Sequence, residues 1–342
     1  MIRSKAPLRL GIAGGGTDVS PFSDVHGGSV LNATINLFAH TFIEPLQNSD
    51  LSYFIAKDIK VEDSIRIDKD INIEDGPLKL HRAVYKKIMN EYNNGNQIPL
   101  RVITQCDAPP GSGLGSSSTL VVSMIEGYRR LLNLPFGEYD IAHLAYEIER
   151  LDCKLAGGKQ DQYAASFGGF NFIEFFEKDR VIVNPLRVKR NILHELESSM
   201  ILFYTGASRD SAKIIEDQIS SLNHSSSKPL EAMLSLKKSS YKIKELLLKG
   251  NITEMAAEFK KSWEHKKSTS PSITNDLIDK IEKAIYDAGA ISMKVSGAGG
   301  GGFMMIFVVP ENKLDVERAL SMFNGSIHNF QFYHKGCISW TI

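Results

Sequence analysis

The chain has 342 residues, more than a single hydrophobic core usually supports, so we expect two domains. Apolar residues make up 42% and charged residues 23%, which is typical of globular proteins and speaks against extensive disorder. Forty Lys and Arg balance forty Asp and Glu, so no basic excess favours nucleic acid or an anionic membrane as a partner. We therefore expect the partners to be small molecules.

The N-terminal segment and the cysteines bear on location. The first residues lack the apolar run of a signal peptide, and no later run approaches the roughly 18 apolar residues of a membrane span. Cys106, Cys153 and Cys337 lie far apart and form no CxxC pair, so we expect reduced core thiols rather than disulfides or a zinc site. These features predict a cytoplasmic protein.

The first half of the chain contains both strand and helix signals. Residues 8–13 are expected to form a strand, and residues 29–44 and 100–106 are rich in β-branched and aromatic residues, as expected of strands. Three further segments have helical periodicity: 78–92, the stretch from Thr119 to about residue 132, and 139–155. Glycines 14–16 follow the first strand and predict a backbone turn.

The pattern changes beyond about Asn184. A short apolar strand is expected at 200–204, and the serine-rich residues 220–229 are expected to form a loop. The later expected elements are helices 230–249, 253–267, 275–288 and 311–323, and strands 290–295 and 303–309. Such alternation suggests an α+β sheet covered by helices.

The sequence PPGSGLGSSST, residues 109–119, has the features of a phosphate-binding loop. Its alternating glycines permit positive φ angles and a close approach of backbone N–H groups to an anion, at the start of an apolar helix. An inert loop or a helix cap uses the same residue types, but needs fewer of them. The loop matches neither the Walker A pattern nor GxGxxG. The residues expected to contact phosphate are Pro110, Gly111, Ser112, Gly113, Leu114, Gly115, Ser116, Ser117 and Ser118.

This loop resembles the PxGxGLGSS motif of the GHMP superfamily, named after the galacto-, homoserine, mevalonate and phosphomevalonate kinases. APLRLGIAGGGTD at residues 6–18 resembles the first motif of that superfamily, and KVSGAGGGGF at 294–303 resembles the third, so the likeness spans nearly the whole chain. The resemblance implies an α+β fold with an N-terminal domain like ribosomal protein S5 domain 2, at 1–184. It also implies a ferredoxin-like domain at 185–342, an active site between the two domains, and use of ATP and Mg²⁺.

Two carboxylates depart from the expected solvated stripe of helix 139–155. The stripe contains polar residues spaced by three or four positions: Asp140, His143, Glu147, Arg150 and Lys154. At about 100° per residue, Glu149 lies roughly 140° from the centre of this stripe, and Asp152 is similarly displaced. A carboxylate in that place needs a partner, either a neighbouring cation or a metal ion.

The resemblance to the GHMP superfamily implies roles in metal binding and catalysis for four residues. It makes Ser117 and Glu149 the Mg²⁺ ligands, with Ser118 as the fallback, and it makes Asp161 of the segment GGKQDQYAASFGG the catalytic base. It also implies that Arg9 keeps Asp161 ionised and stabilises the transferring phosphoryl group. From the residues alone, Asp161 could simply favour a helix N-terminus, and Arg9 could be a surface cation.

The segment GGGTD at 14–18 lacks the GEH or GEY ending of galactokinase-type motifs. It is similar to the branch of sugar-1-kinases that includes D-glycero-D-manno-heptose 7-phosphate kinases and fucokinase-like enzymes. This implies phosphorylation of an anomeric hydroxyl, with that heptose phosphate as acceptor and a bisphosphate as product. The residues expected to bind substrate are Gly15, Gly16, Thr17, Asp18, Lys159, Ser296 and Gly297.

Several alternatives stay open. Asp18 is expected to accept hydrogen bonds from sugar hydroxyls, but it could instead form an Asx turn. The third motif could be a tight turn rather than packing for the loop and substrate. Lys159, Arg209 and Lys294 are candidates for binding the sugar's own phosphate. Fucose, galactose or a mevalonate-type alcohol could be the acceptor, and a non-catalytic metabolite-binding homologue is the alternative from another class.

Overall fold

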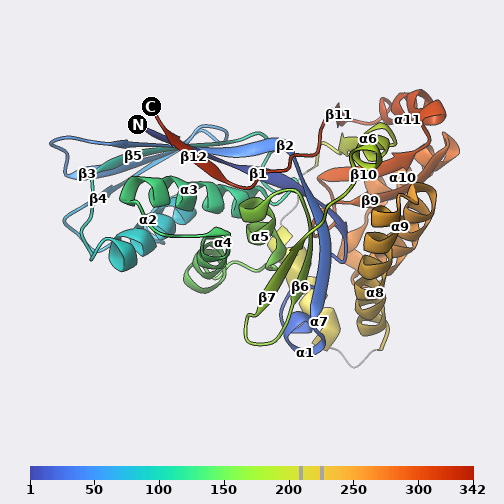
Figure 1. Cartoon of the computed structure of the whole chain (residues 1–342), viewed down its shortest axis with the longest axis horizontal. Coiled ribbons are helices and arrows are strands. Elements are labelled where there is room, and N and C mark those ends of the chain that lie inside the picture. Colours follow the sequence, from blue (N-terminus) through green and yellow to red (C-terminus); the bar gives the residue numbers. More distant parts are fainter. Residues whose placement is uncertain (208–210, 224–226) are drawn as a thin grey trace.

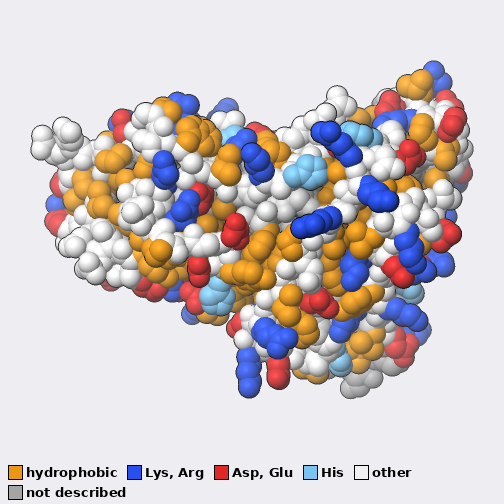
Figure 2. All heavy atoms as spheres, viewed as in Figure 1, with side chains coloured by type: hydrophobic (Ala, Val, Ile, Leu, Met, Phe, Trp, Pro, Cys, Tyr) orange, Lys and Arg blue, Asp and Glu red, His pale blue; other side chains and the backbone are white. Residues whose placement is uncertain are grey.

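The computed structural model describes residues 1–207, 211–223 and 227–342 and contains two sheets, each with its own helices (Figure 1). The expected α+β architecture is confirmed. On the face drawn in Figure 2, basic and acidic side chains are interspersed, in keeping with the formal net charge of zero. Within the described residues, no helix combines the length and hydropathy needed to span a bilayer.

The first sheet has eight strands in the order β12-β1-β2-β5-β3-β4, with β6 on β2 and β7 on β6. Its strands are β1 Ile2–Ala13, β2 Gly28–Pro45, β3 Leu51–Ala56, β4 Val61–Arg66, β5 Leu100–Cys106, β6 Phe170–Phe175, β7 Val181–Pro185 and β12 Ile338–Thr341. The last strand pairs with the first, so the two ends of the chain lie side by side in Figure 1. The domain boundary expected after residue 184 stays a prediction. Strand β12, which lies at the C-terminal end of the chain, belongs to the first sheet.

Helices cover one face of the first sheet and bring the phosphate loop to its edge. They are α2 Lys79–Tyr92, α3 Ser116–Leu132, α4 Glu138–Glu147 and α5 Gln160–Phe167, with the short α1 Phe22–His26 elsewhere. Helix α3 packs against β1 and β2, and residues such as Val121 and Ile125 are fully buried. Burial of an apolar face fixes the start of α3, where the loop ends.

The second sheet is antiparallel, with order β11-β8-β10-β9 and the βαββαβ connection of a ferredoxin-like domain. Its strands are β8 Met200–Tyr204, β9 Ala290–Val295, β10 Phe303–Val308 and β11 Ser326–His328. The helices of this half are α6 Arg190–Ser198, α7 Ser211–Asn223, α8 Ser227–Lys249, α9 Ile252–Lys267, α10 Asp276–Asp287 and α11 Lys313–Leu320.

Strand β10 joins the two halves because it is buried on both faces. Phe303, Met305 and Phe307 face a core shared with Leu8 and Leu10 of β1. The alternate residues of β10 face a second core formed with α10 and α11. This period of two is the side-chain alternation of a strand covered on both sides. The first sheet and the ferredoxin-like half are therefore held together by continuous apolar packing.

Two expected elements differ from the structure. The helix expected at 139–155 leaves α-helical geometry at Glu147 and continues as a π-helix at Ile148–Asp152. The loop expected at 220–229 is wrong for its described residues: 220–223 complete α7 and 227–229 begin α8, while 224–226 lie outside the described residues. Pro229 occupies the first turn of α8, where a missing N–H removes no intrahelical hydrogen bond.

Candidate active site

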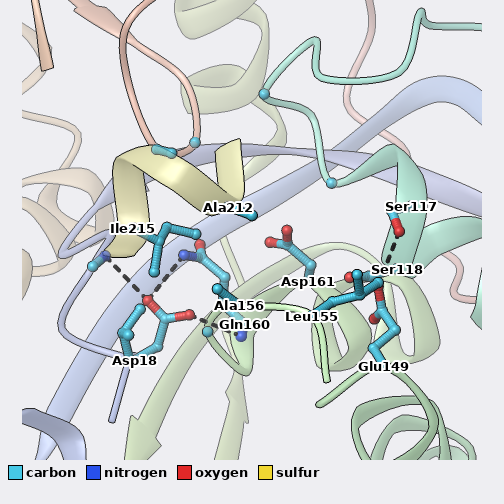
Figure 3. A pocket seen from close by; sticks show the side chains of 18 of the residues that line it. Asp18, Ser117, Ser118, Glu149, Leu155, Ala156, Gln160, Asp161, Ala212 and Ile215 are labelled. Atoms are coloured by element: carbon cyan, nitrogen blue, oxygen red, sulfur yellow. Dashed lines mark hydrogen bonds between the residues drawn. The ribbon is translucent and has the colours of Figure 1, made fainter. Parts of the chain in front are cut away.

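The segments 6–18, 109–119 and 294–303, which resemble the three GHMP motifs, all contribute to one pocket of about 520 Å³ between the two halves of the molecule. The first half contributes Arg9, the phosphate loop, Glu149 and the start of α5. The second half contributes residues of α7, the end of α9 and the third motif. Figure 3 shows Asp161 between two groups of side chains, Asp18 with Gln160 on one side and Ser117 with Glu149 on the other.

The alternating glycines of the phosphate loop all have left-handed backbone angles. Gly111, Gly113 and Gly115 have φ values of 70°, 82° and 76°. Only glycine adopts this region without strain, which explains the spacing. Gly115 is also the N-cap of α3, and a Cβ there would lie 3.0 Å from the Asp161 carboxyl carbon. Glycine at this position thus allows the predicted base to approach the end of the loop.

The side chains of the loop divide into two sets. Ser116, Ser117 and Ser118 open α3 and line the pocket, where the first free N–H groups of the helix are directed. Ser112 and Leu114, in contrast, are buried outside the pocket lining, and Leu114 packs in the core shared by the two halves. Because neither side chain faces the pocket, any phosphate contact at these two positions would come from backbone groups.

The third motif packs directly on the phosphate loop. Ser296 Oγ donates to the Gly113 carbonyl at 2.9 Å, and the Phe303 N–H donates to the Ser112 carbonyl at 2.8 Å. A Cβ on Gly297 would lie 2.9 Å from the Gly113 Cα, so both positions require glycine. The third motif is therefore more than a tight turn: it supports the phosphate loop, and its Gly297 lines the pocket.

The buried Arg9 and the partly exposed Asp161 form an ion pair beside the loop. The Nε and Nη2 atoms of Arg9 lie 2.7 and 2.6 Å from Asp161 Oδ1, and Nη1 donates to the Gly113 carbonyl at 2.5 Å. Arg9 is only 3% exposed, so the surface-cation alternative is wrong. Both guanidinium contacts converge on Oδ1, and among the described residues no hydrogen bond to Oδ2 is recorded. Oδ2 is therefore available to a ligand in the pocket.

Ser117 and Glu149 meet as predicted. Ser117 Oγ donates to Glu149 Oε1 at 3.0 Å (Figure 3). The side-chain amide of Gln162 donates to Glu149 Oε2 at 2.5 Å. Glu149 is 1% exposed. The cation that could pair with it, Arg150, lies 3.9 Å from Glu149 Oε1. In the described part of the chain, no group of three or more His, Cys, Asp or Glu side chains is placed to hold a metal ion by itself. A hydroxyl and one carboxylate fit Mg²⁺, which takes its other ligands from phosphates and water.

The polar stripe expected on helix 139–155 predicted the burial of Glu149 correctly, but it misplaced Arg150 and Asp152. The π-helix at Ile148–Asp152 explains the difference. The wider turn rotates later side chains away from a regular 100° spacing. Arg150, expected on the solvated face, instead points to the Gly158 carbonyl at 3.2 Å and lines the pocket. Asp152, expected to be displaced toward the interior, is partly exposed and lies 4.0 Å from Lys87.

Asp18 is buried and accepts four hydrogen bonds from the protein. Its Oδ1 accepts from the Gly16 N–H and the Gln160 side-chain amide, both at 3.1 Å. Its Oδ2 accepts from the backbone N–H groups of Lys159 and Gln160, at 3.0 and 3.1 Å. Asp18 thus joins the glycine run to the start of α5 and lines the pocket. Its contact with sugar hydroxyls stays a prediction. Thr17, with its hydroxyl on the Gly14 carbonyl at 2.8 Å, is structural.

The lysines proposed for the sugar phosphate do not reach the pocket. The Lys159 ammonium donates to Asp179 at 2.5 Å, and the Lys294 ammonium donates to the Gly11 and Ile12 carbonyls at 3.1 and 3.3 Å. Neither side chain lines the cavity, and burial lowers the pKa of Lys294 to about 7. These two assignments are corrected accordingly. Arg209 lies outside the described residues.

Lys266, which was not predicted from the sequence as a site residue, does line the pocket. It lies in the last turn of α9, is 1% exposed, and donates to the Gly15 carbonyl at 3.1 Å. Burial lowers its pKa to about 8, although the negative charge of Asp18 acts in the opposite direction. One signal was available: Lys266 follows Phe259 by seven positions and Trp263 by three, so it falls on the buried face of α9.

Comparisons with known proteins agree with this geometry. Residues 79–169 match the GHMP kinases N terminal domain, and residues 243–327 match the GHMP kinases C terminal domain. The chain is 42% identical to a D-glycero-alpha-D-manno-heptose 7-phosphate kinase from Campylobacter jejuni, over 100% of this chain and 99% of that protein.

Solved structures give the same result. A D-glycero-D-manno-heptose 1-phosphate kinase from Bacteroides thetaiotaomicron is 42% identical, with a TM-score of 0.83 over 100% of this chain and 99% of the other. The Methanococcus jannaschii mevalonate kinase, 19% identical with a TM-score of 0.76 over 97% and 98% of the two chains, shares the fold. With all three motifs around one pocket and full-length relatives of this identity, the chain belongs to the GHMP kinase family.

Proposed function

We propose that this protein is an ATP-dependent kinase that phosphorylates the anomeric hydroxyl of D-glycero-D-manno-heptose 7-phosphate, giving the bisphosphate. The observation that carries the proposal is the Arg9–Asp161 pair, which lies against the phosphate loop in the pocket. The 42% identity to a heptose 7-phosphate kinase over the full chain supports the choice of acceptor. The names of the two 42% relatives differ in the position of the heptose phosphate, so the test below includes both isomers.

In this proposal, the loop from Pro110 to Ser118 holds the ATP phosphates through backbone N–H groups and the N-terminus of α3. Ser117 and Glu149 would hold Mg²⁺, which neutralises charge on the triphosphate when bound. Gln162 keeps Glu149 oriented, since its amide contacts Glu149 Oε2 and Ser118 Oγ at 2.5 and 3.1 Å. A buried carboxylate held in this way is ready to act as a ligand without rearrangement.

The acceptor hydroxyl would lie next to Asp161 Oδ2. As its oxygen forms a bond to the γ-phosphorus of ATP, the bond between that phosphorus and the β,γ-bridging oxygen breaks and ADP leaves. The proton of the hydroxyl passes to Asp161. Arg9 holds the carboxylate through Oδ1 and places positive charge beside the transferring group. The same arginine contacts the Gly113 carbonyl, which links the base to the loop.

The acceptor is tested by ADP release with a panel of sugars and sugar phosphates, with and without Mg²⁺. Heptose 7-phosphate is expected to react far faster than heptose 1-phosphate, fucose, galactose or mevalonate. Equal or faster reaction of one of the others would overturn the heptose 7-phosphate assignment while leaving a kinase. A protein that binds the sugars but releases no ADP with any of them would be the non-catalytic homologue.

The metal assignment is tested by Ser117→Ala and Glu149→Gln. Both substitutions remove an oxygen ligand, so both are expected to raise the Mg²⁺ concentration for half-maximal rate. Glu147→Gln is a matched control, because Glu147 lies two residues earlier and contacts Lys87 and His143 outside the pocket. An unchanged magnesium titration in both test variants would remove Ser117 and Glu149 from the metal site.

A further inference from the structure

One cation of the pocket has no part in the chemistry described above. Arg9 is paired with Asp161, and Arg150 lies 3.9 Å from the Glu149 carboxylate. Lys266, by contrast, has no salt bridge within 4.0 Å among the described residues, and its two hydrogen bonds go to uncharged acceptors. Since an ammonium group has three donors, one remains available for a ligand.

The surroundings of Lys266 are built around its ammonium group. A Cβ on Gly16 would lie 2.9 Å from Nζ, so the last glycine of the GGGTD segment makes room for it. Nζ also lies 3.4 Å from the side-chain oxygen of Gln218, whose amide nitrogen donates to Thr269 at 2.7 Å. Lys266, Gln218 and Gly16 all line the pocket. A buried charge held by two neutral acceptors is costly unless an anion completes its partners.

Neighbouring charges also favour an anion here. Burial lowers the pKa of Lys294, and the positive charges of the nearby Lys266 and Arg9 lower that pKa further. Asp18 is the nearby acidic group, but its carboxylate already accepts four hydrogen bonds and forms none with Lys266. An anionic ligand beside Lys266 would therefore offset an excess of positive charge in this part of the site.

Lys266 is placed to contact the acceptor rather than the nucleotide. It contacts Gly15 and lies against Gly16, in the same segment as Asp18. In Figure 3, Asp18 lies on one side of Asp161, and the metal pair Ser117 and Glu149 lies on the other. An acceptor whose hydroxyl meets Asp161 from the side of Asp18 would extend toward Lys266.

We propose that Lys266, oriented by Gln218 and the Gly15 carbonyl, binds the phosphate group that the acceptor already carries, and so selects phosphorylated over unphosphorylated sugars. This inference rests on the proposed sugar-phosphate kinase function and adds a specificity-determining residue to it. A phosphate oxygen is a strong acceptor for a buried ammonium, and charge-assisted contacts of this kind are stronger than neutral ones.

The test compares heptose 7-phosphate with unphosphorylated heptose as acceptors for Lys266→Met. We expect kcat/KM for the phosphorylated sugar to fall roughly 10–100-fold, as expected for loss of one charged hydrogen bond, mainly through KM. The value for free heptose and the KM for ATP are expected to stay within about threefold of wild type. Lys267→Met is the matched control, since Lys267 is the next residue and pairs with Glu264 and Glu282 outside the pocket.

A second variant distinguishes loss of phosphate binding from loss of folding. Lys266→Gln keeps a donor for the Gly15 carbonyl but removes the charge, and it is expected to give the same loss of discrimination. Equal losses for both sugars, or no loss for either, would overturn the inference, because a merely structural lysine does not distinguish them. A wild-type protein that turns over no sugar phosphate would instead refute the proposed function, and the inference with it.

Discussion

Asp161→Asn is expected to lower turnover by roughly 10²–10⁴-fold, which corresponds to about 3–5 kcal/mol of transition-state stabilisation. The amide retains the size of the side chain and can still accept a hydrogen bond from Arg9, but it cannot accept the proton of the acceptor hydroxyl. ATP affinity is expected to change little, because the phosphate loop is stabilised by the third motif independently of the carboxylate.

The measurement for Asp161→Asn is the single-turnover rate together with equilibrium ATP binding. A looser transition state would reduce the contribution of the base, since the acceptor oxygen then gains little charge before the phosphoryl group arrives. Turnover within about threefold of wild type lies well below the usual general-base contribution and would remove Asp161 from that role. Arg9 would then be the leading catalytic residue.

Arg9→Met is expected to reduce kcat by roughly 10²–10³-fold, as when one preorganised donor to a developing charge is removed. The substitution also leaves the buried side of Asp161 and the Gly113 carbonyl without their shared partner. Arg9→Lys restores the charge but not the forked geometry, so an intermediate rate is expected.

Arg101→Met is a suitable control for Arg9→Met. Arg101 lies on β5 of the same sheet and forms an exposed ion pair with Glu44 at 2.9 Å, outside the pocket. Such a pair contributes little to stability, so both melting temperature and kcat should match wild type. Arg9→Met with an unreduced kcat, measured at saturating substrates, would contradict the role assigned to Arg9.

Several short apolar strands could be predicted from the sequence with their exact residues. The structure has β5, β8 and β9 with the expected residues, because each is a short apolar or β-branched run with a clear boundary. The edge hairpin β3–β4 and the pair β6–β7 were not predicted. The polar residues in Val61–Arg66 resemble a loop when considered alone, and pairing along β3 supplies their hydrogen bonds.

The candidate site was predictable where local backbone geometry required particular residues. Glycines with positive φ, such as Gly113 and Gly115, are visible in sequence because few other residues can replace them. The burial of Glu149 followed from its place off the polar stripe, whereas the π-helix that reorients Arg150 has no comparable signal in sequence.

Lysines were the least predictable part of the site. Helical spacing places Lys266 on the buried face of α9, but local sequence does not indicate whether a buried lysine contacts the pocket or an ion-pair partner. The distinction between Lys159, held by Asp179, and Lys266, held by Gly15, depends on contacts between segments far apart in the chain. The Lys266 contact spans 251 positions, so only the folded chain brings it to the glycine run.

The most direct test of the central claim is ³¹P NMR of the product formed from ATP, Mg²⁺ and D-glycero-D-manno-heptose 7-phosphate. We expect one ADP per sugar consumed and a new phosphate signal on the anomeric carbon, with the 7-phosphate retained. Heptose 1-phosphate in the same assay should react slowly. A new phosphate on any other carbon, or no ADP formation with any sugar phosphate supplied, would contradict the proposed heptose 7-phosphate kinase activity.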